Sequence, residues 1–271
     1  MPWPLSANLS MLFNDVPLPE RVQLAAEHEF DGVEIQFPYA LPAAELASAL
    51  ERTGMPLVLM NVPAGDLLEG GAGLAGVPGR GDMFARAVDE ALAYAAIVRP
   101  QRVNVLPGRL ADGYSREEAL DTLAVNLRAT ADAFSAMGIK VVCEAINRVD
   151  MPGFLLATGA ELAQMIERVD HPNLSAQLDF YHMQRMGESL PEVIKRLGGQ
   201  IGHVQFADAP GRGAPGSGII DFAAAFRALE AGHYVGWLGA EYRPLDNGGD
   251  GLEWMARWRE AGHITPRARS V

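Results

Sequence analysis

Four short apolar segments of this sequence each end on a side chain that carries oxygen. The four residues are Glu144, Asp179, Gln205 and Glu241, and each follows a strand-like run such as Val141-Val142-Cys143. If the segments are neighbouring parallel strands, three carboxylates and one amide converge at the carboxyl edge of the sheet. Oxygen ligands of this kind suit Mg²⁺ or Mn²⁺ rather than zinc held by thiolates. We therefore predict a divalent-metal site formed by these four residues.

The same positions include two glutamates that could move protons. A divalent ion beside Glu144 and Glu241 would polarise a substrate carbonyl and stabilise an enediolate, while the glutamates transfer a proton between adjacent carbons. The structural alternative is that acids at strand ends cap loops or pair with surface Lys and Arg. That explanation serves for any one residue, but it accounts less well for four such residues at equivalent positions.

Two further side chains are candidates for contact with a substrate. His182 follows Asp179 by three residues and is expected to reach into the pocket from the loop after the sixth strand. Arg212 lies in the segment Pro210-Gly211-Arg212-Gly213, where it is either an exposed charge or a clamp on a substrate carboxylate. His203 lies two residues before Gln205 on the same face of its strand, and we predict a hydrogen-bonded core histidine there.

Short runs rich in Val, Ile and Leu alternate along the chain with longer stretches of helical spacing. We expect strands near Ser6–Leu9, Gly32–Gln36, Leu57–Asn61, Arg102–Leu106, Lys140–Glu144, Leu174–Leu178, Ile201–Gln205 and Trp237–Ala240. We expect helices near Leu18–Glu29, Ala43–Thr53, Asp82–Val98, Ser115–Met137, Ala160–Arg168, Leu190–Leu197, Phe222–Ala231 and Leu252–Ala261. Eight strand–helix units predict an α/β protein with a single (β/α)₈ TIM barrel domain over residues 1–271, because this fold takes about 250 residues.

A doubly wound sheet also alternates strands and helices, so it stays the alternative to the barrel. No phosphate-binding glycine fingerprint follows the first strand, which weakens the dinucleotide-binding form of that fold. Two long connections rich in Gly and Pro, Val62–Gly81 and Asp208–Ile220, follow the third and seventh strands. On a barrel both lie at the carboxyl ends of the strands, where loops build the active site.

Composition and charge narrow the classes of function. Hydrophobic residues make up 49% and charged residues 21% of the chain, the balance of a globular protein with a large core. The net charge of -12 argues against a nucleic-acid partner, which requires clustered Lys and Arg.

The single cysteine, Cys143, excludes an intramolecular disulfide, and we expect it in the core. Because no signal peptide and no apolar stretch of roughly 20 residues is found, we expect a cytoplasmic protein without membrane contact that acts on a small molecule. Homo-oligomerisation stays open.

Several separated motifs occur in an order that is typical of one enzyme family. They are Ser6-Ala7-Asn8-Leu9-Ser10-Met11-Leu12-Phe13, Gly32-Val33-Glu34, Asn61-Val62-Pro63-Ala64-Gly65-Asp66, Glu144-Ala145-Ile146-Asn147, Pro152-Gly153-Phe154, Asp179-Phe180-Tyr181-His182-Met183-Gln184-Arg185, His203-Val204-Gln205-Phe206-Ala207-Asp208 and Glu241-Tyr242. From about Ser6 to Trp258, the sequence that contains them resembles the hydroxypyruvate isomerase family. This family belongs to the xylose-isomerase-like barrels, which also include ketose 3-epimerases and endonucleases of DNA repair.

The resemblance implies roles for the four strand-end residues. Glu144 and Glu241 resemble the paired catalytic glutamates, which in related barrels also bind the metal. Asp179 and Gln205 would complete the shell of a Mg²⁺ or Mn²⁺ ion. Epimerase relatives often have histidine where this chain has Gln205.

The resemblance also implies a substrate, a hydroxy or oxo acid. His182 and Arg212 resemble positions that contact it, and the implied reaction is the isomerisation of hydroxypyruvate to tartronate semialdehyde (2-hydroxy-3-oxopropanoate). Within the enzyme class, the alternatives are a 2-oxo-tetronate isomerase and a ketose 3-epimerase. A non-catalytic sugar-acid binding protein is the alternative from another class. Endonuclease activity is disfavoured by the acidic charge and by the lack of a His-rich ligand set.

Overall fold

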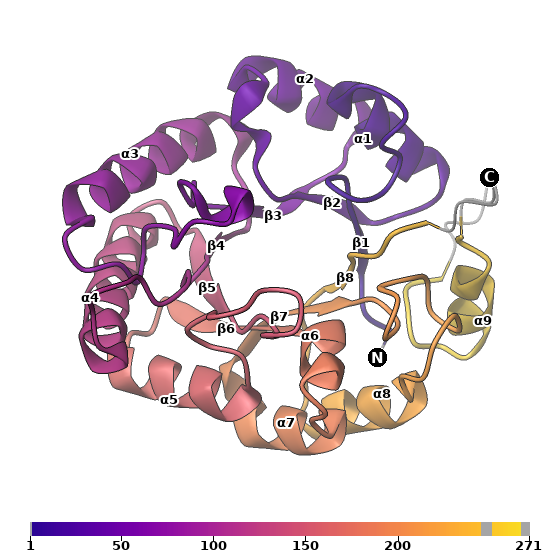
Figure 1. Ribbon diagram of the computed structural model, residues 1–271. Helices are drawn as coiled ribbons and strands as arrows, with labels where there is room; N and C mark the ends of the chain where they lie inside the picture. The colour runs from indigo at the N-terminus through magenta and orange to yellow at the C-terminus, as the bar shows by residue number, and fades with distance from the viewer. Residues whose placement is uncertain (1, 245–250, 267–271) are drawn as a thin grey trace.

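Eight parallel strands close into a barrel in the computed structural model, which describes residues 2–244 and 251–266. Each strand pairs with the next along the chain, and the eighth pairs with the first (Figure 1). The strands are β1 (Leu5–Asn8), β2 (Gly32–Ile35), β3 (Leu57–Asn61), β4 (Arg102–Val105), β5 (Lys140–Glu144), β6 (Leu174–Asp179), β7 (Ile201–Phe206) and β8 (Leu238–Ala240). The predicted (β/α)₈ barrel is confirmed, and the doubly wound alternative is wrong.

Helices follow the strands and surround them as an outer ring (Figure 1). They are α1 (Leu18–Glu27), α2 (Ala43–Thr53), α3 (Gly81–Val98), α4 (Arg116–Ser135), α5 (Gly159–Val169), α6 (Phe180–Arg185), α7 (Leu190–Leu197), α8 (Phe222–Ala231) and α9 (Trp254–Glu260). Short 3₁₀ helices are η1 (Pro38–Ala40), η2 (Leu67–Glu69) and η3 (Gly198–Gln200). The prediction of a loop around His182 is wrong, because this residue lies in α6. Six residues are too few to show a helical period in the sequence.

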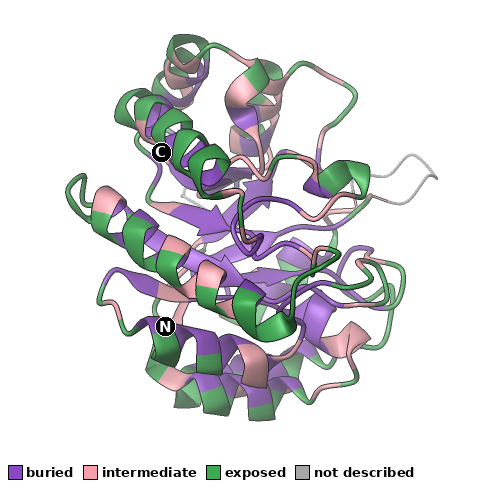
Figure 2. Cartoon of the chain, turned by 60° about the vertical axis from the view of Figure 1, so that its left-hand side comes forward, coloured by how far each residue is buried: buried purple, intermediate pink, exposed green. Residues whose placement is uncertain are grey.

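Strand residues alternate between an apolar layer under the helices and a polar interior of the barrel. In β5, Cys143 packs in the apolar core, as predicted, whereas Glu144 hydrogen-bonds to Asn104 and Gln177 inside the barrel. Buried residues follow the strands and the inner faces of the helices, and exposed residues cover the outer faces (Figure 2). None of the described helices has the length and apolar character needed to cross a membrane.

The two long connections predicted at the carboxyl ends of the strands do shape one cavity there. The connection after β3 brings Leu68 to its wall, and the connection after β7 brings Arg212. The second connection is held by Asp208, whose carboxylate accepts hydrogen bonds from three backbone N–H groups at 2.9 to 3.0 Å. Because these bonds span residues 209 to 220, they fix the loop that carries Arg212.

Candidate active site

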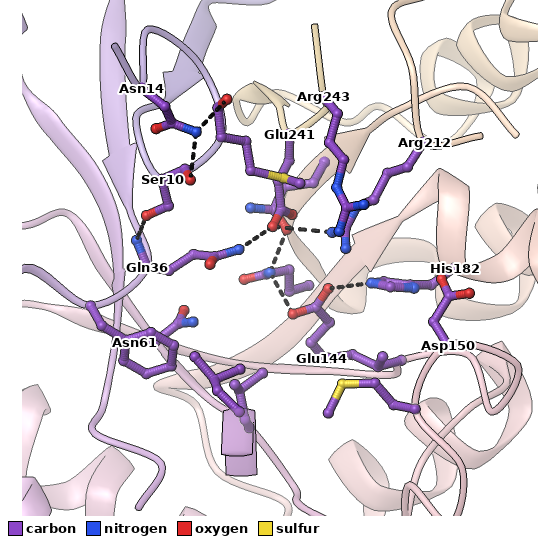
Figure 3. A pocket seen from close by; sticks show the side chains of 18 of the residues that line it. Ser10, Asn14, Gln36, Asn61, Glu144, Asp150, His182, Arg212, Glu241 and Arg243 are labelled. Carbon is purple, nitrogen blue, oxygen red and sulfur yellow. Dashed lines mark hydrogen bonds and ion pairs between the residues drawn. The ribbon is translucent and has the colours of Figure 1, made fainter. Parts of the chain in front are cut away.

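A cavity of about 460 Å³ lies at the carboxyl ends of the strands. Side chains from several strands and loops point into it (Figure 3). Five of the six predicted site residues are among those that line it: Glu144, His182, Gln205, Arg212 and Glu241. The sixth, Asp179, is completely buried and lies within 3.8 Å of both Arg212 and His182. The structure therefore brings all six residues together.

Three carboxylates, those of Glu144, Asp179 and Glu241, form what we call the carboxylate cluster. Arg212 Nη2 lies 3.2 Å from Glu241 Oε1 and 3.8 Å from Asp179 Oδ2. The guanidinium of Arg212 also lies over the ring of Tyr181, 5.1 Å from its centroid. Arg212 is therefore held by charges on one side and by an aromatic face on the other.

Burial makes it costly to ionise every member of this cluster. Burial and repulsion from Glu241 and Asp179 raise the pKa of Glu144 well above its usual range. Burial raises the pKa of Glu241 to about 7 and the pKa of Asp179 to about 6, although Arg212 opposes both shifts. A positive ion placed among the carboxylates would favour their ionised forms. The cluster is therefore suited to hold either protons or a cation.

The ligand atoms fit a hard divalent cation. Asp179 Oδ1 accepts a hydrogen bond from the Tyr181 N–H at 2.7 Å, whereas Asp179 Oδ2 is buried and accepts none from the part of the chain that the structure describes. One ligand atom from each of Glu144, Asp179 and His182 lies within 4.8 Å of the others. When all are ionised, the three negative charges of the cluster and the one positive charge of Arg212 leave a net charge of −2. A divalent cation would neutralise that charge, and oxygen ligands suit Mg²⁺ or Mn²⁺.

Gln205, the amide among the four strand-end residues, is oriented by a carboxylate beneath it. Glu34 on β2 accepts a hydrogen bond from Gln205 Nε2 at 2.8 Å, so the amide oxygen of Gln205 is directed elsewhere. Ser6 and His203 donate to the other oxygen of Glu34. Although burial opposes ionisation, the His203, Ser6 and Gln205 donors lower the pKa of Glu34 below its usual value. The prediction of a hydrogen-bonded core histidine at position 203 is confirmed.

Gln177 joins two of the four strand-end residues. Its Nε2 donates to Glu144 Oε2 at 2.9 Å and to Gln205 Oε1 at 2.6 Å. Asn104 on β4 donates to the same oxygen of Glu144 at 3.1 Å. Both amides therefore fix the position of Glu144 from inside the barrel, and they leave its Oε1 directed toward His182.

Sequence reasoning missed several side chains that hold the site. They are Glu34, Asn104 and Gln177, together with Gln36, which donates to Glu241. Strand parity is the signal that could have found two of them. Gln177 lies two residues before Asp179, on the same face of β6, and Gln36 lies two residues after Glu34, directly after β2 ends at Ile35.

Comparisons with known proteins agree with the fold. Residues 22–258 match the family described as xylose isomerase-like TIM barrel. The chain is 39% identical to hydroxypyruvate isomerase of Escherichia coli over 254 residues, which cover 94% of this chain and 98% of that protein. It is 37% identical to 2-oxo-tetronate isomerase of Pectobacterium atrosepticum over 258 residues, which cover 95% of this chain and 98% of that protein.

Solved structures show the same architecture. A protein of Brucella melitensis, described as an AP endonuclease of family 2, is 38% identical with a TM-score of 0.89, covering 95% of this chain and 99% of that one. D-Psicose 3-epimerase of Clostridium cellulolyticum is 20% identical with a TM-score of 0.77, covering 92% and 88%, and it supports the fold alone. Because the family match and both isomerases extend over most of the chain, this protein belongs to the hydroxypyruvate isomerase family of xylose isomerase-like TIM barrels.

Proposed function

We propose that this chain is an isomerase that interconverts hydroxypyruvate and tartronate semialdehyde by proton transfer beside a divalent cation. The observation that carries the proposal is the carboxylate cluster, with Glu144 and Glu241 directed into one cavity that Gln205 also lines. Its volume of about 460 Å³ falls in the range of about 300–1,000 Å³ that is usual for small-molecule sites.

Glu144, Asp179, Gln205 and Glu241 would hold the cation, and Mg²⁺ or Mn²⁺ suits this set. The buried Asp179 Oδ2 supports the assignment, because it accepts no hydrogen bond from the described residues and Arg212 Nη2 approaches it only to 3.8 Å, which leaves it available to a cation. When bound, the cation would polarise the substrate carbonyl and stabilise negative charge on the neighbouring oxygens.

Glu144 and Glu241 would move the proton. One glutamate removes a hydrogen from C3 of hydroxypyruvate as a proton, and the electron pair forms the double bond of an enediolate. Protonation at C2, with transfer of the hydroxyl proton from the C3 oxygen to the C2 oxygen, gives the aldehyde. Burial raises the pKa of Glu144 above its usual range and that of Glu241 to about 7, so in the metal-free protein Glu241 can hold or release a proton near neutral pH, as a general acid or base requires.

The charge balance indicates where the carboxylate of the substrate binds. A divalent cation would cancel the net charge of the cluster and Arg212, so an anionic substrate needs a further positive group. Arg243 is an exposed residue on the cavity wall and points toward the same space (Figure 3). We assign the substrate carboxylate to Arg243, and we assign Arg212 and His182 to the oxygens near the reacting carbons.

The experiment that tests the function is turnover of hydroxypyruvate by metal-stripped protein with Mg²⁺ or Mn²⁺ restored. Glu144→Gln and Glu241→Gln should each lower kcat by about 10²–10⁴-fold, the usual contribution of a general acid or base, while the fold stays intact. Glu51→Gln, an exposed position on α2, is the matched control and should retain wild-type kcat. Full activity in both active-site variants would overturn the proposal.

Two measurements separate the remaining alternatives. Incorporation of solvent deuterium at carbon is expected for an isomerase, and its absence would favour a binding protein. Relative kcat/KM values for hydroxypyruvate, 2-oxo-tetronates and free ketoses identify the substrate. The proton-transfer chemistry does not identify it, because all three kinds of substrate share that chemistry. A preference for a 2-oxo-tetronate would replace the proposed substrate and keep the mechanism. Endonuclease activity has little support, because the net charge is -12.

A further inference from the structure

Asn147 is a fully buried amide in the connection between β5 and α5. Its oxygen accepts hydrogen bonds from the backbone N–H groups of Val149 at 3.1 Å and Asp150 at 2.8 Å. Its nitrogen lies 3.0 Å from Asp150 Oδ2 and 2.7 Å from His182 Nδ1. Both hydrogens and both lone pairs of the amide therefore have a partner.

Only one orientation of this amide is compatible with its neighbours. If the oxygen and nitrogen exchanged places, the oxygen would face the carboxylate of Asp150. The NH₂ group would then face two backbone N–H groups, which are also donors. The contacts of Val149 and Asp150 therefore place the NH₂ group of Asn147 against His182.

This orientation determines which ring nitrogen of His182 carries hydrogen. An amide nitrogen donates and does not accept, so His182 Nδ1 must accept and carries no hydrogen. The imidazolium form is excluded by the same contact, because it has hydrogen on both nitrogens. The hydrogen is therefore on Nε2, the nitrogen 3.6 Å from Asp179 Oδ2 and 3.8 Å from Glu144 Oε1.

We infer that Asn147 is a positioning residue that fixes His182 in the tautomer with hydrogen on Nε2. His182 then donates a hydrogen bond to a substrate oxygen and does not bind the cation, although its ring nitrogen lies close to two cluster oxygens. A nitrogen that carries hydrogen has no lone pair in the ring plane for a metal. An N–H donor beside the carboxylate cluster would instead stabilise negative charge that develops on the oxygens of the enediolate. The substrate part of this inference rests on the proposed function, and the tautomer does not.

The tautomer can be measured without a substrate. Protein labelled with ¹⁵N-histidine and saturated with Mg²⁺ is studied by long-range ¹H–¹⁵N correlation at neutral pH, which distinguishes a ring nitrogen with hydrogen from one without. The His182 signals are assigned by their loss in His182→Gln. We expect hydrogen on Nε2 alone. Hydrogen on Nδ1, or on both nitrogens, would overturn the inference even if the isomerase activity stands, and a lack of isomerase activity would leave the tautomer result intact.

The role of Asn147 is tested by Asn147→Asp, which keeps the shape and replaces the donor by an acceptor. We expect the hydrogen of His182 to move to Nδ1. Asp150→Asn is the matched control, because it changes the other partner of the same NH₂ group and should leave the hydrogen on Nε2. The double variant N147D/D150N removes repulsion between the two carboxylates, so the test remains decisive if N147D alone does not fold. If a folded variant with Asn147→Asp carries hydrogen on Nε2 alone, the role of Asn147 is refuted.

Kinetics provides a second readout. We expect His182→Gln to lower kcat by about 10²–10³-fold, the usual cost of removing such a donor, and to leave the Kd for Mg²⁺ unchanged. Asn147→Asp should lower kcat by about 10–100-fold. The double variant N147D/H182Q should be no slower than H182Q, because Asn147 acts through His182. Fully additive losses, or weaker Mg²⁺ binding in H182Q, would contradict the inference.

Discussion

Replacing Glu34 by glutamine should weaken metal binding although residue 34 would not touch the cation. In the native protein both carboxylate oxygens of Glu34 act as acceptors, one for Ser6 and His203 and the other for Gln205. A glutamine at this position has only one acceptor oxygen. If that oxygen stays with Ser6 and His203, the NH₂ group of the new glutamine faces the NH₂ group of Gln205. Because two donors cannot bond to each other, Gln205 must then turn its amide oxygen away from the cation site.

The expected magnitude follows from the contacts that are lost. The hydrogen bond between Gln205 and the Glu34 carboxylate is buried and charged, so its loss should lower the free energy of unfolding by about 1.5–3 kcal/mol. Removal of a group that orients a metal ligand typically costs about 10–100-fold in metal affinity. The donors lower the pKa of Glu34, so the stabilisation is present above the ordinary glutamate pKa of 4.5 and is lost as the pH falls through the lower folded value. The stability difference between wild type and Glu34→Gln should therefore shrink at acidic pH.

Calorimetric titration with Mg²⁺ and urea denaturation at several pH values measure these effects. Ser6→Ala is the matched control, because it removes one donor to Glu34 but leaves the bond to Gln205. It should lower the free energy of unfolding by about 0.5–1.5 kcal/mol and leave Mg²⁺ affinity unchanged. Wild-type Mg²⁺ affinity in Glu34→Gln would refute the reasoning, because Gln205 would then not depend on Glu34 for its orientation.

Three further predictions concern the cluster and its surroundings. Burial raises the pKa of Glu241 from 4.5 to about 7 and that of Asp179 from 3.8 to about 6, so the folded metal-free protein binds protons that the unfolded chain releases. The melting temperature of the metal-free wild type relative to Glu241→Gln should therefore fall as the pH rises from about 4 to about 7, because groups with a lowered pKa, such as Glu34, are common to both proteins. Mg²⁺ should stabilise the wild type more at the upper end of this range. The opposite trend in a pH series of thermal melts would contradict the raised pKa values. Arg243→Gln should raise the KM for hydroxypyruvate by about tenfold or more with little change in kcat, and an unchanged KM in steady-state kinetics would place the substrate carboxylate elsewhere. Gly239→Ala would put a Cβ 2.3 Å from Glu34 Oε1. Urea denaturation should show a loss of about 1–3 kcal/mol, and wild-type stability would be incompatible with this packing.

The barrel and the strand-end residues could be predicted from sequence because both depend on local patterns. All eight strands were identifiable from apolar runs, and no predicted boundary differs from the structure by more than one residue. Parallel strands in a barrel place their carboxyl ends on one face, so residues such as Glu144 and Gln205 must meet there whatever the details of packing. Helix α6 was not predictable in this way, because six residues are too short for a periodic signal.

By itself, the sequence determined the fold, the family resemblance and the six residues that come together at the site, since each follows from residue type and position along a strand or its loop. Only the tertiary structure decided how those side chains are oriented. Glu34 and Gln205 are 171 residues apart in sequence, and Asn147 and His182 are 35 apart. Whether an amide presents its oxygen or its nitrogen depends on donors and acceptors that different strands and loops bring together. No local pattern carries that information, because hydrogen-bond direction is a property of the assembled barrel.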